Sequence, residues 1–93
     1  MLPSPPLRLY TRAGCCLCEG LAERLQALDP PPPLTAVDVD GDPVLQGRWG
    51  LEVPVLALVA PPGEEAEPRI LPRVPPRLAG EGLRRWLERQ GVR

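Results

Sequence analysis

The sequence contains no histidine, and this absence excludes more chemistry than any residue present. Without an imidazole there can be no Cys-His or Ser-His-Asp nucleophile system and no mixed Cys/His zinc site. Lysine is also absent, so all 11 cationic side chains are arginines, and with 12 acidic residues the formal net charge is −1. A chain with a net charge this close to zero lacks the positive charge that attracts nucleic acid or an anionic membrane, so we expect it to bind neither.

Long apolar runs are missing as well. No stretch approaches the roughly 18 consecutive apolar residues that cross a bilayer, and residues 1–6 lack the basic and apolar parts of a signal peptide. The three cysteines form one cluster at 15–18, whereas secreted disulfide-stapled proteins distribute theirs along the chain. We therefore expect a cytoplasmic protein that does not bind membranes.

The composition is that of one small globular domain. Hydrophobic residues make up 43% of the 93 residues and charged residues 25%, as in ordinary soluble domains. The 15 prolines and 9 glycines are numerous, but the proline clusters fall between apolar runs, where they stiffen loops. We expect a single domain over residues 1–93, and a monomer.

The first half of the chain predicts a βαβ unit. Residues 7–10 alternate as a short strand does, and residues 34–39 are rich in β-branched side chains. Between them, apolar residues recur at helical spacing from Cys15 onward until the prolines at 30–33 stop the helix. The two strands should be parallel. The residues expected on the buried helix face are Leu17, Leu21, Leu25 and Leu28, with Ala22 beside them.

The second half predicts a short helix, two strands and a terminal helix. Asp42 is a candidate N-cap for a helix from Pro43 to about Trp49, which Gly50 would end. Residues 53–59 form the most apolar run and predict a buried strand, and after a turn at 61–65 residues 67–73 can return as a ragged edge strand. The last helix has an apolar face of Leu78, Leu83, Trp86 and Leu87. We assign both tryptophans to packing.

The chemistry of the chain lies in a Cys-x-x-Cys pair at the start of the first helix. Residues three apart share a helix face, so Cys15 and Cys18 can reach disulfide distance, while adjacent cysteines cannot bridge without strain. Free N–H groups and the helix dipole favour a thiolate at Cys15. Cys15 projects from the loop and Cys18 lies a turn inside the helix, so we assign attack to Cys15 and resolution of the mixed disulfide to Cys18.

Alternatives remain open at this point. The cluster could hold an iron-sulfur or other metal centre, shared between two chains because one chain offers only this cluster, although we assign no metal ligand. The domain could also be a non-catalytic interaction module. The cysteines could be small buried hydrophobic residues, and Cys16 has no role that the sequence defines.

The segment from Leu9 to Cys18, with Tyr10 and Arg12 before the cysteines, resembles the active-site segment of glutaredoxins. A second element, Val53-Pro54, is similar to the Val-Pro step in which a cis-proline faces the cysteines of that family. The chain is similar in particular to short bacterial glutaredoxin-like proteins of undetermined substrate. The resemblance implies a three-layer thioredoxin-like α/β fold with a four-stranded mixed sheet in βαβ-α-ββ-α order, and a thiol-disulfide oxidoreductase.

The resemblance also implies roles for residues around the cysteines. In that family the residue before the cis-proline aligns the incoming thiol through its backbone. Val53, which precedes Pro54, would have this role. Tyr10 and Arg12 would belong to the same substrate-binding site, Arg12 by favouring the thiolate or pairing with a substrate carboxylate. The substrate would be a protein or low-molecular-weight disulfide, and no cofactor is required. Glutathione is a candidate reductant, but the glycine pair and aspartate that hold it in many glutaredoxins are not clear in residues 77–82.

Overall fold

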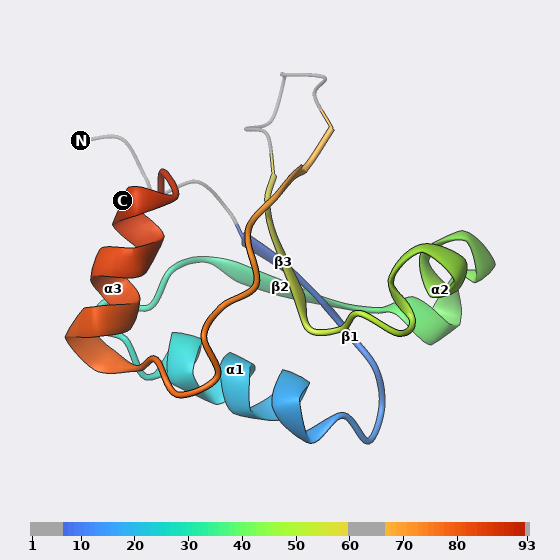
Figure 1. Ribbon diagram of the computed structural model, residues 1–93, viewed down its shortest axis with the longest axis horizontal. Coiled ribbons are helices and arrows are strands. Elements are labelled where there is room, and N and C mark those ends of the chain that lie inside the picture. The colour runs from blue at the N-terminus through green and yellow to red at the C-terminus, as the bar shows by residue number, and fades with distance from the viewer. Residues whose placement is uncertain (1–6, 60–66, 93) are drawn as a thin grey trace.

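The computed structural model describes residues 7–59 and 67–92, and within them a four-stranded sheet has the order β2-β1-β3-β4 (Figure 1). The strands are β1 (Leu7–Thr11), β2 (Leu34–Asp38), β3 (Val55–Leu58) and β4 (Arg69–Ile70). β1 pairs in parallel with β2 and antiparallel with β3, and β3 pairs antiparallel with β4. The predicted mixed sheet and element order are confirmed.

In the described part of the chain, three α-helices and one 3₁₀ turn connect and cover the strands. They are α1 (Cys16–Gln26), the 3₁₀ turn η1 (Val39–Gly41), α2 (Pro43–Trp49) and α3 (Gly80–Arg89). The bounds of α2 are those predicted, because Asp42 caps it by accepting the Val44 N–H at 2.9 Å. The 3₁₀ turn begins at Val39, so β2 ends one residue earlier than the strand predicted over 34–39. Asp38 starts this turn by accepting the Asp40 N–H at 2.9 Å.

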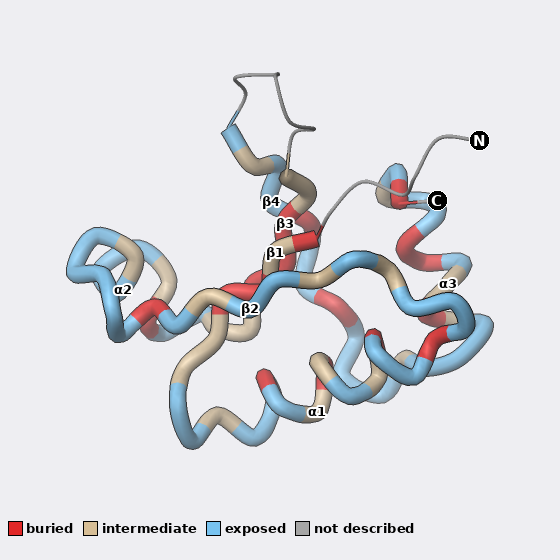
Figure 2. The backbone as a smooth tube through the Cα atoms, turned by 180° about the vertical axis from the view of Figure 1, so that it is seen from behind, coloured by how far each residue is buried: buried red, intermediate tan, exposed pale blue. Residues whose placement is uncertain are grey.

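The core has two parts, one on each face of the sheet. Alternate residues of a strand point to opposite faces, so Leu9 and Leu56 face α1 and α3 while Tyr10 and Val55 face η1 and α2. The first part is large and contains the buried faces of both long helices. The second is small, and α2 has no buried residue, which Figure 2 shows as a mostly pale blue segment. The result is three layers with a thin third layer.

The buried face of α1 differs from the prediction at one position. Leu21 and Leu25 are buried as expected, but Leu17 is 60% exposed and Cys18 is 1% exposed. At about 3.6 residues per turn, Leu17 falls at the edge of the stripe that Leu25 and Cys18 define, in a first turn with little beside it to pack against. A cysteine therefore occupies the core position that the pattern gave to a leucine.

The strands in the second half are shorter than predicted. β3 begins at Val55 because the Val53 N–H turns back to the carbonyl of Trp49, at 3.1 Å. The expected edge strand over 67–73 pairs through two residues only, since Pro68 and Pro72 have no N–H for a longer ladder. The turn predicted at 61–65 lies outside the described residues.

Leu78 was predicted on the α3 face but precedes the helix, whose N-cap is Ala79. It still packs against the large core, because Arg24 of α1 donates to its carbonyl at 2.7 Å and holds that segment in place. Trp86 is buried in the large core, and Trp49 is half-buried against the small one. Packing thus accounts for both tryptophans.

Candidate active site

Cys15 is the N-cap residue of α1 and is presented by the loop that follows β1. Gly14 has φ of +77°, a conformation that glycine adopts without the strain of a side chain. It directs the chain into Cys15, whose backbone is extended and whose N–H donates to the Arg12 carbonyl at 3.2 Å. The Cys15 carbonyl accepts the Glu19 N–H at 3.1 Å, which starts the helix. The Cys15 Sγ accepts the Cys18 N–H at 3.1 Å. Sulfur therefore replaces the usual capping oxygen at this helix end.

Cys15 and Cys18 form a disulfide, with their Cα atoms 5.2 Å apart. Cys15 is half-buried, whereas Cys18 is buried in the core face of α1. Cys16 is a free, exposed thiol. The loop therefore offers one partly accessible sulfur of the pair and shields the other. Within residues 7–59 and 67–92, no group of three or more His, Cys, Asp or Glu residues is arranged to hold a metal ion.

The Val53-Pro54 step lies at the same end of the sheet as the cysteine loop. Val55 pairs with Tyr10, so the residues before Val55 run beside the C-terminal end of β1, where the chain leaves for Cys15. The peptide bond between Val53 and Pro54 is cis, as is that between Asp29 and Pro30. The Val53 N–H is used by Trp49, and its carbonyl accepts no hydrogen bond from the part of the chain that the structure describes.

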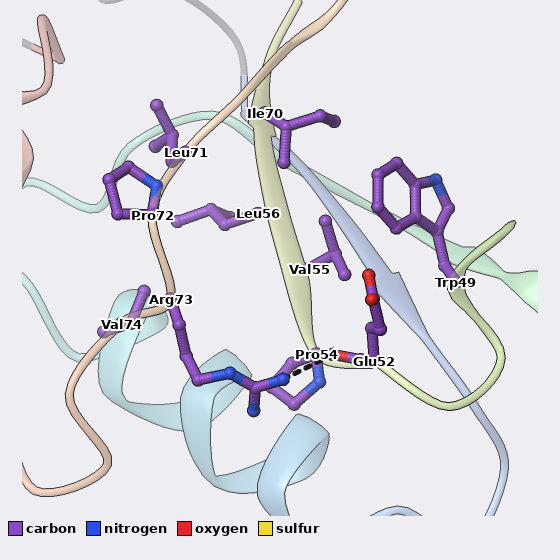
Figure 3. A pocket seen from close by; sticks show the side chains of 10 residues that line it. All are labelled: Trp49, Glu52, Pro54, Val55, Leu56, Ile70, Leu71, Pro72, Arg73 and Val74. Atoms are coloured by element: carbon purple, nitrogen blue, oxygen red, sulfur yellow. Dashed lines mark hydrogen bonds between the residues drawn. The ribbon is translucent and has the colours of Figure 1, made fainter.

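A shallow groove begins at Pro54 and follows β3 toward β4 (Figure 3). Most of its lining residues are apolar, and Arg73 donates to the Glu52 carbonyl at 3.2 Å on its polar rim. Its volume is about 130 Å³, well below the roughly 300–1,000 Å³ of small-molecule pockets. The groove has room for a side chain but not for an organic cofactor. The lining residues are Trp49, Glu52, Pro54, Val55, Leu56, Ile70, Leu71, Pro72, Arg73 and Val74.

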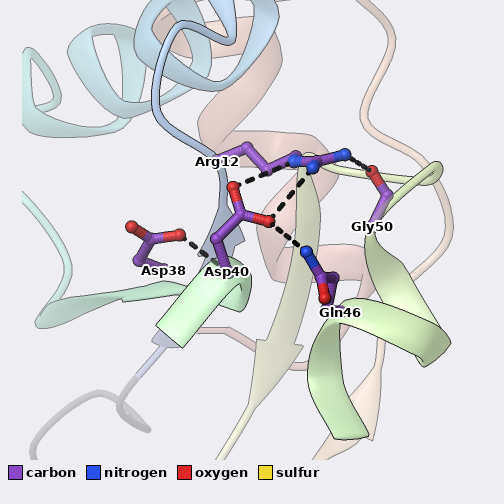
Figure 4. A network of polar contacts seen from close by, with 5 residues as sticks. All are labelled: Arg12, Asp38, Asp40, Gln46 and Gly50. Carbon is purple, nitrogen blue, oxygen red and sulfur yellow. Dashed lines mark hydrogen bonds and ion pairs between the residues drawn. The ribbon is translucent and has the colours of Figure 1, made fainter. Parts of the chain in front are cut away.

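Tyr10 and Arg12, the other two predicted site residues, make internal contacts. The Tyr10 ring is 5% exposed, stacks on Trp49 with centroids 6.0 Å apart, and accepts a long hydrogen bond from Arg8. The Arg12 guanidinium pairs with Asp40 and donates to the Gly50 carbonyl at 3.0 Å (Figure 4). Their predicted contacts with substrate stay predictions.

Asp40 is a residue of this site region that the sequence did not single out. The Arg12 hydrogen bond lowers the pKa of the Asp40 carboxyl below its ordinary value of 3.8; desolvation opposes this shift, and a hydrogen bond from Gln46 supports it. The carboxyl is therefore ionised at neutral pH. No local pattern could have paired Arg12 with a residue 28 positions away.

Asp40→Asn is expected to lower the melting temperature at neutral pH, and the difference from wild type should shrink as the pH falls below 3.8. A carboxyl whose pKa is lowered by folding stabilises the folded state above its unfolded pKa, and this contribution is lost as pH falls through the folded pKa. Circular dichroism melts of both proteins across acidic pH measure the effect. A difference that stays constant with pH would contradict it.

The fold and the capped cysteine pair define a glutaredoxin-like protein of the thioredoxin superfamily. The chain belongs to the family described as Glutaredoxin-like domain (DUF836), which residues 6–88 match. The family resemblance predicted from the cysteine segment and the Val-Pro step is thereby confirmed. A glutaredoxin-like domain with two cysteines in disulfide contact is compatible with thiol redox function.

Among solved structures, the chain is similar to target protein XcR50 from X. campestris, with 30% sequence identity and a TM-score of 0.58. The match covers 89% of this chain and 96% of that one, so the similarity extends over most of both chains. No curated protein matches the chain. In the described residues no helix is long and apolar enough to cross a membrane.

Proposed function

We propose that this protein is a thiol-disulfide oxidoreductase that reduces disulfides with the Cys15-Cys18 dithiol. The observation that carries the proposal is the unequal exposure of two cysteines in disulfide contact at a helix N-terminus. A half-buried Cys15 can meet a substrate disulfide, and a buried Cys18 can meet only Cys15. The structure with its disulfide formed is then the oxidised product of the reaction.

The first step is attack by the Cys15 thiolate on one sulfur of the substrate disulfide. A bond forms between the Cys15 Sγ and that sulfur, the substrate S–S bond breaks, and the other sulfur leaves as a thiolate that takes a proton from water. The Cys18 N–H, which lies 3.1 Å from the Cys15 Sγ in the oxidised protein, is placed to stabilise the thiolate before it attacks.

The second step is displacement by Cys18. Its thiolate attacks the Cys15 Sγ of the mixed disulfide, the second substrate sulfur leaves, and the intramolecular disulfide forms. Two electrons have then passed from the protein to the substrate. A thiol reductant, for which glutathione is a candidate, returns the protein to the dithiol in two similar exchanges. We place this cycle in the cytoplasm, where low-molecular-weight thiols keep such pairs reduced.

Substrate alignment would use the Val53-Pro54 step. The Val53 N–H is occupied by the Trp49 carbonyl, so the Val53 carbonyl is the group available to accept an N–H beside the substrate cysteine. The groove that starts at Pro54 has room for one neighbouring side chain. Together they favour a peptide or protein disulfide, in which an N–H and a side chain flank the reacting sulfur.

Cys18→Ser is expected to trap the first intermediate. A serine hydroxyl cannot displace the product, so the reduced variant should accumulate a mixed disulfide through Cys15 when it meets a disulfide substrate. Non-reducing electrophoresis of the variant with a disulfide-bonded protein such as insulin, followed by peptide mass spectrometry, identifies the linked residue. The adduct should disappear on addition of dithiothreitol.

The control is the same variant with Cys16 also replaced, Cys16→Ser with Cys18→Ser. Because Cys16 is exposed, it could form adducts of its own, and the double variant leaves Cys15 as the one thiol able to react. A mixed disulfide that is lost in this double variant, and therefore had formed on Cys16, would contradict the proposed mechanism.

A further inference from the structure

Arg12 lies in the loop between β1 and the cysteines, and its side chain connects three segments (Figure 4). Its Nε and Nη2 contact the two carboxylate oxygens of Asp40, each at 3.1 Å, and its Nη1 donates to the Gly50 carbonyl at 3.0 Å. The guanidinium thus joins the cysteine loop to the 3₁₀ turn and to the end of α2. This two-pronged geometry is specific to arginine.

Asp40 is itself held from two further sides. Gln46 of α2 donates to its Oδ1 at 3.1 Å, and the Asp40 N–H donates to Asp38 at 2.9 Å. Gln46 thus holds the carboxylate and Asp38 holds the backbone of Asp40, so two contacts besides Arg12 restrain this residue between the 3₁₀ turn and α2. An ion pair held by several such bonds restrains the chain more than an isolated surface pair does.

Both ends of this network lead to the reacting groups. The backbone carbonyl of Arg12 accepts the Cys15 N–H at 3.2 Å, and Gly50 begins the short segment that ends at Val53-Pro54. Gly50 is the buried C-cap of α2 and donates its N–H to the Gln46 carbonyl at 2.9 Å, so the segment is anchored to the end of α2. The Arg12 side chain is therefore a direct bridge between the cysteine loop and the segment before Pro54.

We propose that Asp40 and the Gly50 carbonyl act through Arg12 as positioning groups that fix the cysteine loop relative to the Val53-Pro54 step. This inference rests on the proposed oxidoreductase function and deepens it. A substrate disulfide must meet the Cys15 sulfur and the Val53 carbonyl at the same time, so a change in their separation slows attack on a peptide disulfide. In this role the charge of Arg12 acts inside the protein, where it pairs with Asp40.

The test is the rate at which reduced protein cleaves a short peptide whose cysteine carries a 5-thio-2-nitrobenzoate group in disulfide linkage. Release of the coloured thiolate reports the first attack. Asp40→Asn and Arg12→Lys should each slow it by about 10- to 100-fold, the scale on which small misplacements act. Alkylation of Cys15 by iodoacetamide needs no alignment and should change by less than about threefold.

The lysine variant separates positioning from charge. Lysine keeps the positive charge but cannot bridge two carboxylate oxygens and a carbonyl together, so a charge acting on Cys15 or on the substrate would survive in it. Combining Arg12→Lys with Asp40→Asn should add little to either single change, because both break one bridge. Asp42→Asn is the matched control, since it removes a carboxylate from the same loop and asparagine still caps α2.

The possible outcomes distinguish the positioning role from the oxidoreductase function. Cleavage at the wild-type rate by Arg12→Lys or Asp40→Asn, or alkylation that slows in parallel with cleavage, would overturn the positioning role and leave the oxidoreductase function standing. Wild-type protein that does not cleave the peptide disulfide would overturn the function itself. Near-ultraviolet circular dichroism verifies that the variants are folded, as expected for changes at side chains that are about one-third exposed.

Discussion

Replacing Cys15 by serine is expected to lower the rate of disulfide reduction to the rate measured without protein. The attacking sulfur is lost, and Cys18 cannot replace it, because Cys18 is 1% exposed and lies in the core face of α1. The hydroxyl of serine is not ionised at neutral pH and does not attack disulfides. Turnover of insulin disulfides with dithiothreitol as the reductant, corrected for the reaction of dithiothreitol alone, measures the loss.

Cys16→Ser is the matched control for this experiment. It removes a neighbouring thiol that is exposed and outside the disulfide, so turnover should be retained. Comparison of Cys15→Ser with Cys16→Ser shows whether turnover needs a thiol at position 15 or only the presence of a thiol in the cluster. Substantial turnover by Cys15→Ser, or its loss in Cys16→Ser, would mean that a different cysteine carries the attack.

Leu25→Ala is expected to have the largest effect on stability. Leu25 is fully buried where α1 meets the sheet, and its truncation removes apolar contacts and leaves a cavity. Such changes cost about 2–5 kcal/mol, a large part of the 5–15 kcal/mol that keeps a domain folded. For a domain of this size the melting temperature should fall by at least about 8 °C.

Leu17→Ala in the same helix provides the comparison. The same atoms are removed, but Leu17 is 60% exposed, so the free energy of unfolding should change by no more than about 0.5 kcal/mol. Thermal melts of the oxidised proteins followed by circular dichroism compare the two. Equal melting temperatures would mean that the core does not lie where the structure places it.

Local patterns were sufficient to predict most of the fold. The helix that Asp42 caps and the strand around Leu56 follow from spacing, capping and turn chemistry, which act over a few residues. Leu17 was wrongly predicted to be buried. Periodicity shows which residues share the apolar stripe of a helix, but not how far along the helix the sheet extends beneath that stripe. Cys18 took the buried position, and that follows only from how α1 lies against the strands.

The geometry of the candidate site could be predicted in part. The Cys15-Cys18 pair, its helix N-terminus and the Val53-Pro54 step could be found because each is a short motif in a recognisable setting. The pairing of Arg12 with Asp40 could not, since it joins loops brought together by the strand order and any of 11 arginines could have been involved. Long-range polar pairs of this kind become visible only once the chain is folded.

The burial of Cys18 also bears on how this protein would tolerate peroxide. Of the two paired cysteines, the half-buried Cys15 is the one that an oxidant in the loop would meet first and convert from a thiolate to a sulfenic acid. The Cys18 thiol, one helical turn away, can condense with that sulfenic acid to form the disulfide and release water, which ends the oxidation before the irreversible sulfinic stage. Because Cys18 is shielded in the core, the thiol needed for this rescue is the one that the oxidant reaches last.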